Sequence, residues 1–141
     1  MTNHSLHRRG AFSLVELIVV MVIIGLLSSL VALRTRSYLV SSKQNAARAQ
    51  IATIVAAIES FYADQSRYPT GEEGIAILTE STNSFPEGFL KKVPSDPWGN
   101  DYEYLNPGSE SPFEVICFGG DAREGGEGGD TDISSETLDA R

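Results

Sequence analysis

The sequence has few of the side chains that usually carry enzyme chemistry. Its single cysteine, Cys117, cannot form a disulfide within the chain, so no internal cross-link supports the fold. Both histidines, His4 and His7, lie before the first long apolar run. A nucleophile activated by a neighbouring base therefore has no candidate pair in the later part of the chain, and no phosphate-binding motif is present. We expect a protein that is not an enzyme.

Positive charge is scarce in the second half of the chain. From residue 59 onward there are five basic and eighteen acidic residues, a formal charge of −13, whereas residues 1–58 hold six basic residues and one acid. A nucleic-acid-binding protein would place a basic patch on its folded part, and this chain does the reverse. The pattern argues against nucleic acid as a partner and indicates an acidic, soluble region that can attract cations.

Charge is almost absent from residues 12–33, where Glu16 is the single ionisable side chain. As an α-helix this run would be about 33 Å long at roughly 1.5 Å per residue, enough to cross a bilayer core of about 30 Å. A cleaved secretory signal has a shorter apolar core and a small-residue cleavage site after it, which is missing here. We expect a transmembrane helix. The simplest alternative for its role is that of an uncleaved membrane anchor in an unrelated protein. Arginines flank the run on both sides, so the positive-inside rule leaves its orientation open.

Residues 8–16, Arg-Arg-Gly-Ala-Phe-Ser-Leu-Val-Glu, resemble the N-terminal signal of type IV pilins and type II secretion pseudopilins. In that family the prepilin peptidase removes a short basic leader just before a phenylalanine and methylates the new amino group. The resemblance implies that residues 1–11 are the leader, that the Ala11–Phe12 bond is cut and that Phe12 is N-methylated. The commonest pattern has glycine directly before the phenylalanine. Here Ala11 follows Gly10, so cleavage after Gly10 is the alternative.

The same resemblance gives Glu16 a role in assembly. Counted from Phe12, Glu16 is the fifth residue, and in this family a glutamate there meets the amino terminus of a neighbouring subunit. Such a charge pair sets the register between helices, because an unpaired buried charge is costly. Gly25 falls at a common glycine position of these helices and is the second expected assembly residue. Leu33 stands where the family usually has a proline.

Motifs in the second half resemble the major pseudopilin of type II secretion systems. They are Arg67-Tyr68-Pro69-Thr70, Glu73-Gly74 and Pro94-Ser95-Asp96-Pro97-Trp98-Gly99-Asn100. The resemblance implies a structural subunit that polymerises through its N-terminal helix into a helical pseudopilus and so supports protein export. Its implied partners are copies of itself, the prepilin peptidase, the inner-membrane assembly platform and the minor pseudopilins. The implied location is the bacterial inner membrane, crossed once, with the C-terminal domain in the periplasm.

The chain after the apolar run predicts a second helical part. Neither proline nor glycine interrupts residues 26–67. Apolar side chains recur there at spacings of three and four, which is typical of a helix with one face on a packed core. We expect one helix from Phe12 to about Tyr62, apolar all round over residues 12–33 and amphipathic over 34–66. The stripe consists of Ala47, Ile51, Ile54, Val55, Ile58, Phe61 and Tyr62.

Residues 67–141 are expected to form the soluble domain. Thr70 and Glu73 fit a capping box, which predicts a short helix to about Leu78. Residues 102–105 and 113–118 are typical of strands joined by a turn, with Cys117 buried in the second. Trp98 is expected to anchor the core or a loop. The predicted fold class is α+β and pilin-like, a long helix packed against a small antiparallel sheet.

The segment from Gly119 to Asp132 holds six glycines and five acids and has almost nothing apolar. Left alone it should be disordered, and its carboxylates should repel one another. Calcium would reverse both effects, because it takes about six to eight oxygens from carboxylates and carbonyls in flexible geometry. A solvated, flexible acidic loop is the alternative.

Major pseudopilins have a similar loop that binds one calcium ion. The resemblance implies Asp121, Asp130 and Asp132 as carboxylate ligands, with backbone carbonyls from Phe118 and Gly126. Two other functions stay open on the sequence alone. One is a type IV pilin or competence-type pseudopilin, and the other is a membrane-anchored calcium-binding domain.

Overall fold

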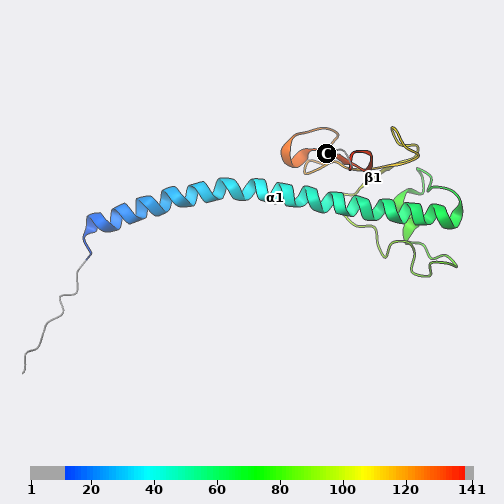
Figure 1. Ribbon diagram of the computed structural model, residues 1–141, viewed down its shortest axis with the longest axis horizontal. Helices are drawn as coiled ribbons and strands as arrows, with labels where there is room; N and C mark the ends of the chain where they lie inside the picture. Colours follow the sequence, from blue (N-terminus) through cyan, green and yellow to red (C-terminus); the bar gives the residue numbers. More distant parts are fainter. Residues whose placement is uncertain (1–11, 139–141) are drawn as a thin grey trace, which may run out of the picture. The chain divides into compact units, whose positions relative to one another are not determined.

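A computed structural model describes residues 12–138, without the side chains of residues 30–36. The expected leader, including Gly10 and Ala11, lies outside the described residues. The chain divides into two compact units, Met1–Tyr38 and Leu39–Arg141. In chain order the elements are α1 (Leu14–Gln65), 3-10 helix η1 (Gly74–Thr79), β1 (Glu103–Leu105), β2 (Glu114–Cys117), 3-10 helix η2 (Gly128–Asp130), β3 (Ile133–Ser134) and 3-10 helix η3 (Ser135–Thr137) (Figure 1).

Helix α1 begins and ends for local reasons. At its start the Ser13 hydroxyl accepts a hydrogen bond from the backbone N–H of Glu16 at 3.2 Å, a typical N-cap. At its end Ser66 takes a left-handed conformation, with φ of 57°, and its N–H donates to the carbonyl of Tyr62 at 2.8 Å. This arrangement satisfies one of the last free carbonyls of the helix. The single uninterrupted helix was predicted, and its end at Gln65 lies slightly beyond the expected Tyr62.

In the first unit, the apolar side chains of α1 are exposed on every side. Those from Leu14 to Leu27 range from 48% exposed at Val20 to 76% exposed at Leu14. Over the part of the chain that the structure describes, no helix has the length and hydropathy needed to span a membrane.

In the second unit, one face of α1 is buried against the rest of the domain. The buried positions follow the predicted spacing of three and four, so the expected stripe is confirmed for most of its members. Val55 is half-buried, and Tyr62 is 44% exposed with its ring stacked on Tyr68 at 4.5 Å between centroids. The buried core consists of Ala47, Ile51, Ile54, Ala57, Ile58, Phe61, Ile75, Leu78, Tyr102, Tyr104, Phe113, Val115, Cys117 and Ile133.

The sheet has three antiparallel strands in the order β1-β2-β3. Tyr104 pairs with Val115, and Cys117 pairs with Ile133. The predicted α+β class with a small antiparallel sheet is confirmed. The third strand was not predicted, since two residues after a glycine-rich loop give no alternating pattern.

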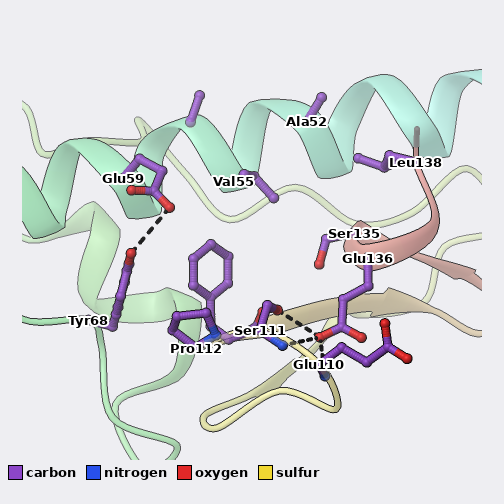
Figure 2. A pocket seen from close by; sticks show the side chains of 12 residues that line it. Ala52, Val55, Glu59, Tyr68, Glu110, Ser111, Pro112, Ser135, Glu136 and Leu138 are labelled. Atoms are coloured by element: carbon purple, nitrogen blue, oxygen red, sulfur yellow. Dashed lines mark hydrogen bonds between the residues drawn. The ribbon is translucent and has the colours of Figure 1, made fainter. Parts of the chain in front are cut away.

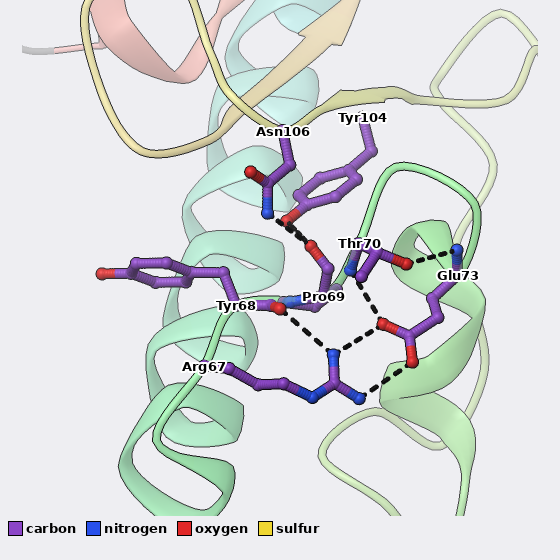
Figure 3. A network of polar contacts seen from close by, with 7 residues as sticks. All are labelled: Arg67, Tyr68, Pro69, Thr70, Glu73, Tyr104 and Asn106. Atoms are coloured by element: carbon purple, nitrogen blue, oxygen red, sulfur yellow. Dashed lines mark hydrogen bonds and ion pairs between the residues drawn. The ribbon is translucent and has the colours of Figure 1, made fainter.

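The predicted capping-box hydrogen bonds are present but they close a turn, and the helix after it is a 3-10 helix that begins at Gly74 with Glu73, not Thr70, at its N-cap. Thr70 and Glu73 exchange two hydrogen bonds, at 2.8 Å and 3.2 Å, and Arg67 donates to both oxygens of Glu73 at 2.7 Å and 2.8 Å. Figure 3 shows this network, in which Tyr104 and Asn106 also donate to the carbonyl of Pro69. The turn after α1 is thereby tied to the end of β1.

Candidate functional site

The acidic glycine-rich loop connects β2 to β3, so two paired strands hold its ends. Gly119, Gly125, Gly126 and Gly128 have positive φ, a backbone conformation that glycine adopts without strain, and so does Ala122. The loop is folded closely around Asp130. A Cβ atom at Gly126 would lie 2.6 Å from the carbonyl oxygen of Asp130, and one at Gly120 would lie 2.8 Å from its Oδ1. The glycines are therefore needed for this conformation and not only for flexibility.

The two carboxylate oxygens of Asp132 differ in their hydrogen bonding. Its Oδ2 accepts a hydrogen bond from the N–H of Gly125 at 2.7 Å. Its Oδ1 is buried and has no hydrogen-bond partner within the described residues. A buried polar oxygen without a partner is costly, and a bound ion or water would satisfy it. A hard cation would satisfy this oxygen.

The two backbone carbonyls that the resemblance implies as calcium ligands have no hydrogen-bond donor in the described chain. Within residues 12–138, neither the Phe118 nor the Gly126 carbonyl accepts a hydrogen bond. Other carbonyls of the loop are engaged: that of Gly119 accepts from the Asn100 side chain at 3.0 Å, and that of Gly129 accepts from the Gly120 N–H at 3.0 Å. In the described chain the carbonyls of residues 120–125 accept no hydrogen bond either, so the predicted pair is available for a cation but is not singled out.

Asp121 is less favourably placed than Asp132 to bind a cation. Its side chain is exposed, and its Oδ1 accepts from the N–H of Arg123 at 3.2 Å. No three acidic, histidine or cysteine side chains in the described range lie together as a metal-ligand group. The residues fit calcium in the chemistry of their oxygens and in the unpartnered Asp132 atom, but Asp121, Asp130 and Asp132 do not lie together as one group in the described part of the chain.

The loop also rests on the turn that contains Trp98. Asp96 is buried, and its Oδ1 accepts from the N–H groups of Trp98 at 2.9 Å and Asn100 at 2.7 Å. Trp98 is half-buried against the core, which agrees with its predicted role as an anchor. The Cys117 thiol donates to the other oxygen of Asp96 at 3.3 Å. Burial, with Asp96 beside it, raises the pKa of this thiol to about 11, which makes Cys117 an unreactive core residue.

The sequence did not predict the role of Glu136, whose carboxylate accepts several hydrogen bonds beside a groove. A groove of about 640 Å³ lies between α1, residues 110–113 and η3, and Figure 2 shows the side chains that line it. There Glu136 Oε1 accepts from the N–H of Glu110 at 2.8 Å and from the N–H and hydroxyl of Ser111 at 2.9 Å and 2.7 Å. These contacts hold η3 to the loop before β2. Partners 25 residues apart leave no local sequence signal.

The expected assembly residues lie in the first unit. Glu16 is in the first turn of α1, where the positive end of the helix dipole favours a negative charge. Gly25 lies inside α1, and a Cβ atom there would meet no other atom within 4 Å. Phe12, the expected first mature residue, is 77% exposed and precedes the helix.

Comparison with known proteins settles which family this chain represents. Residues 34–136 match the family model described as "Type II secretion system (T2SS), protein G". The chain belongs to this family. Residues 6–32 match the prokaryotic N-terminal methylation motif, so the protein G match and the methylation motif together cover most of the chain.

Relatives of this protein G family member align with it over nearly the whole chain. The type II secretion system core protein G of Vibrio cholerae is 37% identical, with 94% of this chain and 95% of that protein covered. The core protein G of Pseudomonas aeruginosa is 36% identical, with 91% and 95% covered. The crystal structure of the major pseudopilin from the type 2 secretion system of enterohaemorrhagic Escherichia coli is similar with a TM-score of 0.58. It is 27% identical, and 69% of this chain and 89% of that one are covered.

Proposed function

We propose that this chain is a structural subunit of a type II secretion pseudopilus. The observation that carries the proposal is the family match over residues 34–136, joined to a helix whose first part exposes apolar side chains all round. Such a helix needs lipid or sister helices around it, whereas the packed second unit does not. Contacts between copies that repeat without closing build a filament.

The N-terminal part of the proposal concerns processing and the membrane. The prepilin peptidase cuts between Ala11 and Phe12 and methylates Phe12, and the methylation-motif match over residues 6–32 supports this. Residues 12–33 then insert once into the inner membrane, with the C-terminal domain in the periplasm. The assembly platform of the membrane and the minor pseudopilins are its further partners. Glu16 pairs with the methylated amine of a neighbouring copy, with Gly25 in the same assembly helix.

Deletion of the gene in its own bacterium tests the proposed function. Exported enzymes should accumulate in the periplasm and disappear from the culture medium, and a plasmid copy should restore their export. Unchanged export in the deletion strain, with no second copy of the gene present, would refute a role in secretion.

We propose in addition that the acidic loop binds one calcium ion as a structural element. Asp130, Asp132 and the Phe118 and Gly126 carbonyls would hold it, with Asp121 joining them. The support is the buried Asp132 oxygen without a partner and the two carbonyls that accept no hydrogen bond in the described chain. The ion would neutralise the loop carboxylates and fix the loop between β2 and β3.

Calcium should therefore raise the melting temperature of the full chain in detergent. Calcium at about one hundred times its dissociation constant adds roughly 2.7 kcal/mol to the free energy of unfolding, because it binds only the folded chain. Asp132→Asn should lose this calcium-dependent increase. Glu127→Gln, at an exposed acid of the same loop, should keep it. An unchanged melting temperature of the wild-type chain in millimolar calcium would overturn the calcium proposal.

A further inference from the structure

The acidic loop contacts α1 at residues that no sequence motif singled out. The side-chain amide of Gln44 donates to the carbonyl of Gly128 at 2.7 Å, across 84 positions of sequence. A Cβ atom at Gly129 would lie 3.5 Å from a methyl carbon of Val40. Val40 and Gln44 are four positions apart and so lie on the same face of the helix. Thus η2, which ends at the proposed ligand Asp130, rests on this face.

Gly120 lies between the Trp98 ring and the carboxylate of Asp130. The Cβ position of Gly120 lies 3.1 Å from an edge carbon of the Trp98 ring and 2.8 Å from Asp130 Oδ1. The Lys43 ammonium lies 5.5 Å from the centroid of the same ring, within the range of a cation–π interaction. Lys43 and Trp98 therefore link α1 to Gly120, which lies next to Asp130.

We infer that Gln44 is a positioning residue for the cation of the acidic loop, and that Gln44 and Trp98 couple the occupancy of the loop to the packing of α1 around residues 40–44. This inference rests on the proposed calcium site. Gln44 is not proposed as a ligand of the cation. It fixes the Gly128 carbonyl, and through it the turn that places Asp130 and leads into Asp132. Coupling of two sites is reciprocal, so the bound cation also stabilises this part of α1.

Trp98 is the only tryptophan of the chain, so its fluorescence reports on the loop directly. The full chain in detergent is titrated with calcium, with fluorescence as one readout and calorimetry as a second, independent one. Wild-type Trp98 emission should change and saturate together with the calorimetric binding curve. Gln44→Ala should raise the calcium dissociation constant about three- to tenfold, the effect expected for one lost hydrogen bond.

A matched control is Gln65→Ala, which removes the same side chain from α1 at an exposed position whose amide contacts only Asp64 among the described residues. It should bind calcium as the wild type does. Equal calcium affinity of Gln44→Ala and wild type would overturn the coupling and leave the calcium site standing. Absence of calorimetric binding by the wild type would overturn the calcium proposal and this inference with it.

Hydrogen exchange of the wild-type chain tests the coupling without any substitution. Calcium should slow exchange of the amides at residues 40–48 as well as those of the loop. Slower exchange confined to the loop, with residues 40–48 unchanged, would contradict the coupling even if Gln44→Ala did not fold.

Discussion

Single carboxylates hold the turns of this domain together, and Glu73 is the clearest of them. The Arg67 guanidinium and the Thr70 N–H lower the pKa of Glu73 to about 2, from an ordinary value of 4.5. A depressed pKa means that the charged form stabilises the fold. This contribution is fully present above about pH 4.5 and is lost as the pH falls towards 2.

Glu73→Gln should therefore lower the melting temperature at pH 6, and the difference from wild type should shrink steadily below pH 4.5 and be nearly absent at pH 2. The measurement is the melting temperature of both chains across this pH range. Glu72→Gln, at the exposed neighbouring acid, should track the wild type throughout. A difference between Glu73→Gln and wild type that stayed constant with pH would show that the carboxylate charge is not what stabilises the turn.

Residue-level features of this kind were predictable only where the partners are close in sequence. The Thr70–Glu73 capping box lies within four residues, so its pattern could be read directly. The Ser13 cap of α1 also precedes Glu16 by three residues, and a search for caps would have found it. Gln44 and Gly128, by contrast, meet only because the chain folds back on α1.

At the scale of elements, the acidic loop is shaped by its glycines as much as by its acids. Gly125 and Gly126 both have positive φ, of 91° and 106°. A Cβ atom at Gly126 would collide with the backbone of Asp130, whereas one at Gly125 would meet nothing within 4 Å. The two neighbours therefore separate the effect of a collision from the effect of backbone strain.

Gly125→Ala should destabilise the domain by about 1–3 kcal/mol, the usual cost of a strained left-handed residue. Gly126→Ala should cost more than this and should also weaken calcium binding, because the collision displaces Asp130. Chemical unfolding with and without calcium measures both effects. Equal losses for the two variants would mean that the loop is not held against Asp130.

The elements themselves were predicted unevenly. The stripe on α1 repeats over four turns, which makes the periodic signal strong, and its core members are buried as expected. Strand β3 has two residues and η1 is a 3-10 helix, and neither produces a distinctive spacing. Composition alone also could not predict that the acidic loop has a defined conformation, because that conformation depends on contacts with Gln44 and Trp98.

Across the whole molecule, the two units place opposite demands on their surroundings. The second unit is acidic and buries its own core, and the first exposes apolar side chains from Leu14 to Leu27. The division was visible in the sequence as a change in charge and hydropathy. What surrounds the first unit could not be read from a single chain, because a filament is defined by contacts between copies.

Electron microscopy of filaments tests the central claim most directly. Cells that express the chain with a type II secretion assembly machinery should form filaments that contain it, with a mature chain that begins at methylated Phe12. Glu16→Ala should be processed and inserted equally well, yet its filament yield should fall at least tenfold, because the subunits would lose the proposed charge pair between Glu16 and the neighbouring amino terminus. Normal filaments from Glu16→Ala, or no filaments from the wild type, would contradict the account.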